Sequence, residues 1–78
     1  MTDWSELPNT QWLIDNDGRV EIGRVGPIPC AAIASDEQSM LAALVRRDDE
    51  SLDEFFVRLE TAIDIALNDQ IFTDEING

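Results

Sequence analysis

Residues 51–67 contain the strongest indication of local structure in this sequence. Ser51 and Glu54 have the spacing of a capping box, in which two side chains bond the free backbone N–H groups of a helix start. Apolar residues recur here at intervals of three and four positions: Leu52, Phe55, Phe56, Leu59, Ala62, Ile63, Ala66 and Leu67. The pattern predicts an amphipathic helix over about residues 52–68, whose apolar stripe another element must cover.

A hairpin is the predicted element before this helix, over about residues 10–25. The letters DNDG supply a turn signal between two stretches that contain β-branched and aromatic residues. A three-residue loop would place Trp12 opposite Ile22 and Ile14 opposite Val20, all on one face of the hairpin. The glycines and prolines that follow predict a bend, and then a short buried strand over residues 30–34.

Residues 36–47 are compatible with two structures. The letters SDEQS fit a polar hairpin loop, and residues 40–46 have the length of a strand, which we favour. However, Ser35 and Gln38 also have capping-box spacing, and Leu41, Leu44 and Val45 could form a helical stripe. A helix here is the alternative.

Together these elements predict an α+β fold in a single domain over residues 1–78. A small antiparallel sheet of three to four strands packs against one long C-terminal helix; the alternative is a β-hairpin plus a helical hairpin. A chain of 78 residues has room for one modest core only. We expect residues 1–9 to be loosely ordered and residues 69–78 to form an acidic-hydrophobic tail.

The charge of the chain is strongly acidic. Seventeen Asp and Glu stand against five basic residues, which gives a net charge of −12. Nucleic acids and anionic membranes are bound through Lys and Arg, so we expect no direct contact with either. The sequence has no apolar run near 18 residues and no secretion-signal pattern at its start, and we therefore expect a cytoplasmic protein.

Few residue types suited to catalysis are present. The chain has no His, Lys or Tyr, and Cys30 has no histidine to activate it. We expect no enzymatic activity, no cofactor and no metal site, since zinc sites need clusters of Cys and His. The DNDG turn resembles the start of a calcium loop, but Gly26 stands where the twelfth-position acid is needed.

The predicted helix carries a second pattern on its outer side. At about 100° per residue, Asp53, Glu60 and Asp64 fall on one flank, and Val57, Thr61 and Ile65 form a small apolar stripe beside them. These six residues are our candidate partner-binding site, although a solvated charged face is an equally simple interpretation.

Two functions follow from this surface. The first is an acidic protein-interaction module that meets a basic, nucleic-acid-binding partner by phosphate mimicry. The second is a homodimeric structural protein, joined through the helix stripe, a sheet edge or the tail. From LVRR to TDEING the chain resembles, in size and composition, short acidic proteins of bacteria, phages and plasmids. That resemblance implies an inhibitor or one half of a regulatory pair.

Overall fold

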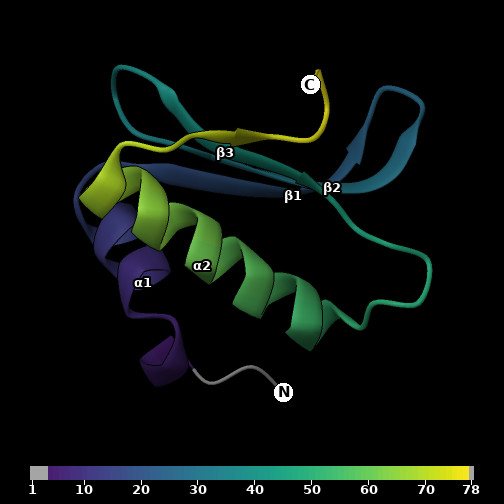
Figure 1. Ribbon diagram of the computed structural model, residues 1–78, viewed down its shortest axis with the longest axis horizontal. Coiled ribbons are helices and arrows are strands. Elements are labelled where there is room, and N and C mark those ends of the chain that lie inside the picture. Colours follow the sequence, from purple (N-terminus) through teal and green to yellow (C-terminus); the bar gives the residue numbers. More distant parts are fainter. Residues whose placement is uncertain (1–3, 78) are drawn as a thin grey trace.

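The computed structural model describes residues 4–77, which form one sheet with helices on one of its faces (Figure 1). The elements in chain order are η1 (Trp4–Glu6), α1 (Pro8–Asp15), β1 (Arg19–Val25), β2 (Ile28–Ser35), β3 (Met40–Val45), α2 (Leu52–Asp69) and β4 (Thr73–Asp74). The α+β class, with a small sheet against one long C-terminal helix, is confirmed.

The sheet has four strands in the order β1-β2-β3-β4. β1, β2 and β3 form an antiparallel meander, in which Ala32 faces Ile22 on one side and Leu44 on the other. β4 pairs with β3 in parallel, at Ala42 and Ala43. The sheet is therefore mixed, where the sequence had predicted an antiparallel one.

The predicted hairpin over residues 10–25 is wrong in its first half, because Pro8–Asp15 is the helix α1. Proline is favoured in the first turn of a helix, where its missing N–H has no partner to lose. α1 lies on the sheet through Leu13, which is only 1% exposed, while Trp12 is 52% exposed and does not face Ile22. The hairpin is formed instead by β1 and β2, with its turn at Gly26 (φ 57°) and Pro27.

The DNDG signal marks the exit from α1. The backbone N–H groups of Asn16 and Gly18 donate to the carbonyl of Leu13, and Asp17 has the left-handed φ of 67°. A Cβ at position 18 would lie 2.5 Å from Cδ1 of Leu13. Glycine is therefore needed here for a close approach to the helix end.

The strand predicted for residues 40–46 is confirmed as β3, and the two-helix alternative is wrong. The SDEQS loop joins β2 to β3 and is held by Asp36, whose Oδ1 accepts from the backbone N–H groups of Gln38 (2.8 Å) and Ser39 (2.7 Å). These bonds hold the pKa of Asp36 below its ordinary value. These local bonds of Asp36 take the place of the capping box that Ser35 and Gln38 could have formed.

The core lies between the sheet and α2. The strands contribute small residues at their centre, such as Ala32, Ala34 and Ala42, all 0% exposed. Larger side chains of α2 fill the space above them, notably Phe55 and Ile63, also 0% exposed. The alanines let the helix approach closely, and each large buried side chain contributes on the order of 1.5 to 3 kcal/mol.

The two ends of the described chain are both attached to this core. In the segment that was expected to be loosely ordered, residues 4–9 form η1 and the start of α1, and Leu7 is 2% exposed; residues 1–3 lie outside the described residues. The tail adds β4, and the N–H of Glu75 donates to the carbonyl of Ala43 at 2.7 Å. Ile71 and Phe72 remain 56% and 53% exposed.

Candidate functional site

α2 begins at the capping box that the sequence predicts. The side chain of Ser51 accepts from the N–H of Glu54, and that of Glu54 accepts from the N–H of Ser51, so the predicted capping box is present. The helix ends at Asp69, and the C-cap residue Gln70 has the left-handed conformation. All six candidate partner-binding residues lie between these two ends.

The candidate residues differ in their exposure. Val57 is 56% exposed, and Asp53, Thr61 and Asp64 are also exposed. Glu60 and Ile65 are half-buried. Of the six, Glu60 has hydrogen bonds that reach another element of the fold.

Glu60 binds the N-terminus of α1. Its Oε2 accepts from the backbone N–H of Asn9 (3.1 Å) and from the Asn9 side-chain amide (2.6 Å), and its Oε1 accepts from the N–H of Thr10 (2.8 Å). The free N–H groups of a helix start favour a negative charge, and the Ncap residue Leu7 has no side chain that could bond them. Glu60 therefore acts as the missing cap, supplied by the neighbouring helix.

Asp64 has only local bonds. Its carboxylate accepts from the side-chain amide of Asn68, one turn further along α2. It lies with Asp53 and Val57 on the outward side of the helix, so two exposed carboxylates flank an exposed apolar side chain. This outer α2 face, defined by Asp53, Val57, Thr61 and Asp64, is what remains of the predicted site.

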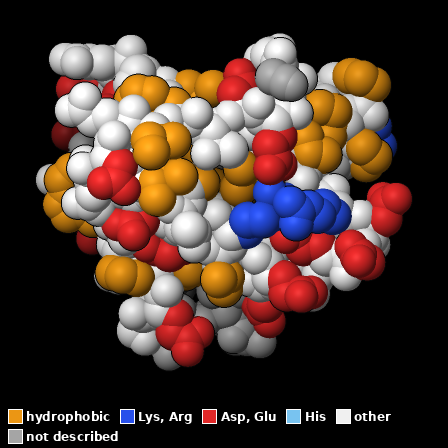
Figure 2. Space-filling model, viewed as in Figure 1, with side chains coloured by type: hydrophobic (Ala, Val, Ile, Leu, Met, Phe, Trp, Pro, Cys, Tyr) orange, Lys and Arg blue, Asp and Glu red, His pale blue; other side chains and the backbone are white. Residues whose placement is uncertain are grey.

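Arg58 is the centre of a charge network beside that face. Its guanidinium donates to Glu50 (2.9 and 3.0 Å), to Glu75 (2.8 Å) and to the carbonyl of Val45 (2.7 Å), and it lies 5.6 Å from the ring centre of Phe55. Figure 2 shows arginine side chains gathered in one patch on this side of the molecule, with acidic side chains around them. The network joins the loop before α2, the helix and the tail.

The hydrogen bond from Arg58 lowers the pKa of Glu50 from 4.5 to about 2. The pKa of Arg58 is raised by the same bond. For Glu75, burial favours the protonated form, but the Val45 N–H and Arg58 outweigh it, so its pKa is also lowered. These carboxylates are fixed as anions within the fold, and a basic partner would have to compete with Arg58 for them.

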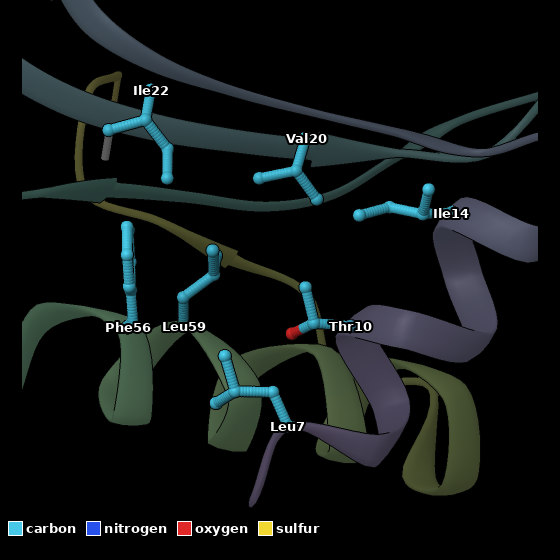
Figure 3. Close-up of a pocket in the computed structure, with 7 residues that line it drawn as sticks. All are labelled: Leu7, Thr10, Ile14, Val20, Ile22, Phe56 and Leu59. Atoms are coloured by element: carbon cyan, nitrogen blue, oxygen red, sulfur yellow. The ribbon is translucent and has the colours of Figure 1, made fainter. Parts of the chain in front are cut away.

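A small apolar pocket lies on the other side of α2, where α1, β1 and α2 meet (Figure 3). It has a volume of about 120 Å³ and is lined by Leu7, Thr10, Ile14, Val20, Ile22, Phe56 and Leu59. Ile14 and Ile22 at its rim are 46% and 42% exposed. The sequence predicts Ile14, Val20 and Ile22 on one face of a hairpin. In the structure the three side chains are together, but they line this pocket.

The described residues show little that resembles a catalytic or metal centre. Within residues 4–77, no three His, Cys, Asp or Glu side chains are grouped so that they could hold a metal ion. Cys30 is half-buried in β2. No helix in the described part combines the length and the apolar character needed to cross a membrane.

Comparison with known proteins gives no further information about the site. The chain matches no family model, no curated protein and no solved structure.

Proposed function

We propose that this protein is a non-enzymatic interaction module, which binds a basic protein surface through the outer α2 face. The observation that supports this most directly is Val57, a β-branched apolar residue left 56% exposed between two exposed carboxylates. An apolar centre with a charged rim is the usual arrangement of a protein interface.

The charge of the chain supports a basic partner. With a net charge of −12 on 78 residues, the molecule as a whole repels anions and attracts a cationic surface. A partner that normally binds nucleic acid has such a surface, and carboxylates held on a rigid helix can occupy the places of phosphates. The proposed role is therefore that of an inhibitor or regulator of such a partner.

The test uses the two carboxylates of the outer α2 face, Asp53 and Asp64, both of which are exposed. The partner is captured from an extract of the native host, and its affinity is measured by calorimetry at two salt concentrations. Asp53→Asn with Asp64→Asn should weaken binding at least tenfold, which is about 1.4 kcal/mol, and should reduce the salt dependence. Asp15→Asn with Glu37→Gln is the matched control, because it removes two exposed charges elsewhere. Equal affinity and an equal salt slope in both double variants would contradict the proposal.

A homodimer is the second candidate, and the exposed apolar residues of the tail favour it. Ile71 and Phe72 stay more than half exposed, although β4 holds the segment just after them against β3. Small domains often cover such side chains with a second copy. Sedimentation velocity should then show a dimer that Phe72→Glu dissociates into folded monomers, or Val57→Glu if the seam lies on α2. A wild type that stays monomeric at high micromolar concentration excludes both seams.

A further inference from the structure

The apolar pocket beside β1 contains one polar group that the fold does not satisfy. Thr10 is 3% exposed, and its Oγ1 is buried without a hydrogen-bond partner. In Figure 3 the methyl group of Thr10 points toward Val20, and its hydroxyl points toward the space between Leu7 and Leu59. Buried hydroxyls almost always find a partner, so an unpaired one at the wall of a pocket calls for an explanation.

The neighbouring groups do not supply that partner. The backbone N–H of Thr10 donates to Glu60, so this carboxylate bonds the main chain of α1 and not the hydroxyl. A helical threonine commonly bonds the carbonyl one turn back, yet the Thr10 hydroxyl makes no such bond. The hydroxyl thus has an unused hydrogen bond, and a turn of the Thr10 side chain about its Cα–Cβ bond, which moves the hydroxyl to the place of the methyl group, would bring it to a molecule inside the pocket.

The size and lining of the pocket define what such a molecule can be. An engineered apolar cavity of about 150 Å³ holds benzene, so a pocket of about 120 Å³ that opens to the surface has room for one six-carbon group. Its lining is otherwise apolar, and no charged side chain contributes to it. A charged ligand would lose its hydration without compensation, and an anion would also meet the nearby carboxylate of Glu60.

We propose that this pocket is a binding site for a small neutral ligand, in which a compact apolar group carries one hydroxyl that bonds Thr10. Phenols and short branched alcohols belong to this class. Leu7, Ile22, Phe56 and Leu59 enclose the apolar part, and the ligand hydroxyl pairs with Oγ1. The site is separate from the outer α2 face and does not depend on the function proposed for that face.

Phenol and toluene are the probes that test this proposal, because they have nearly the same shape and differ in the hydroxyl. Each is titrated into the 78-residue protein labelled with ¹⁵N, and amide shifts give the site and the dissociation constant. Shifts should be confined to the residues that line the pocket. Phenol should bind roughly five- to tenfold more tightly than toluene, as expected for one additional hydrogen bond.

Four variants identify the source of that preference and the location of the site. Thr10→Val keeps the shape of the side chain and should abolish the preference for phenol, whereas Thr10→Ser should retain it. Thr61→Val is the matched control, an exposed threonine of α2, and should behave as wild type. Val20→Phe should fill the pocket and prevent binding of both probes, which tests the location even if Thr10→Val folds poorly.

Two results would overturn the proposal. One is the absence of shifts at the lining residues with either probe, which would leave the hydroxyl to a bound water. The other is equal affinity for phenol and toluene in the wild type, which would indicate a purely apolar pocket, suited to a hydrophobic side chain of a protein partner.

Discussion

Replacing Glu60 by Ala tests how strongly α2 holds α1. The substitution removes three hydrogen bonds to a carboxylate, two from the N–H groups of Asn9 and Thr10 and one from the Asn9 amide. Loss of an ordinary helix cap costs about 1 kcal/mol, and bonds to a charged group are stronger. We therefore expect Glu60→Ala to lower the free energy of unfolding by about 2 to 3 kcal/mol.

That loss is large for a domain of this size. A chain of 78 residues has a total stability on the order of 4 to 12 kcal/mol. Each kcal/mol corresponds to a shift of roughly 4 to 8 °C in the unfolding temperature of a small domain, so we expect a decrease of about 8 to 24 °C. Urea unfolding followed by circular dichroism measures the first quantity, and a thermal scan measures the second.

Two further variants separate the capping role from a general charge effect. Glu60→Gln keeps one carbonyl oxygen but replaces the other with an NH₂ group, which cannot accept from Asn9, so about half of the loss should remain. Asp64→Asn removes the same charge from the exposed side of the same helix and should change stability by less than about 0.5 kcal/mol. If Glu60→Ala lowers the free energy of unfolding no more than Asp64→Asn does, Glu60 does not act as the cap of α1.

The other predictions concern the charge network, the helix exit and the core. Because the pKa of Glu50 falls from 4.5 to about 2 on folding, its contribution should be complete above pH 4.5 and vanish as the pH falls toward 2. The stability difference between wild type and Glu50→Gln should close over that range in acid-dependent urea titrations. Gly18→Ala would place a methyl group 2.5 Å from Leu13 and should cost about 1 to 3 kcal/mol by denaturant unfolding. Ile63→Ala empties a fully buried site and should cost about 2 to 5 kcal/mol in the same assay.

The parts of the fold that could be predicted from the sequence are those set by local interactions. The capping box of α2 joins two residues three positions apart, and the apolar stripe follows from helical periodicity alone. The Asp36 loop is also local, since its bonds span two and three residues. Both elements were predicted close to their observed bounds.

The helix α1 could not be predicted in this way. The letters TQWLID alternate well enough for a strand, and the residue that caps α1 lies 50 positions further along the chain. Only the folded structure brings Glu60 to Thr10. Pro8 is the one local signal for a helix start here, since proline is favoured in the first turn of a helix.

The candidate functional surfaces also differ in how far the sequence could predict them. The outer α2 face was predictable because all of its residues belong to one helix and one periodicity. The pocket collects residues from three elements, and its unusual feature, the Thr10 hydroxyl, becomes apparent only when its neighbours are known. Glu60 shows the converse error, because its position on the helical flank predicted a role at the surface.

The acidity of this chain consequently has more than one cause. Among residues 4–77, at least six carboxylates accept hydrogen bonds from backbone N–H groups and so hold a loop, a cap or a strand: Asp36, Glu50, Glu54, Glu60, Asp74 and Glu75. For five of them the pKa is lowered, so the fold requires their charged form. Neutralising acids at random would therefore also weaken bonds within the fold, and a loss of binding could not be assigned to recognition. Asp53 and Asp64 are better choices, because a loss of binding there, with unchanged stability, would assign the charge to recognition rather than to folding.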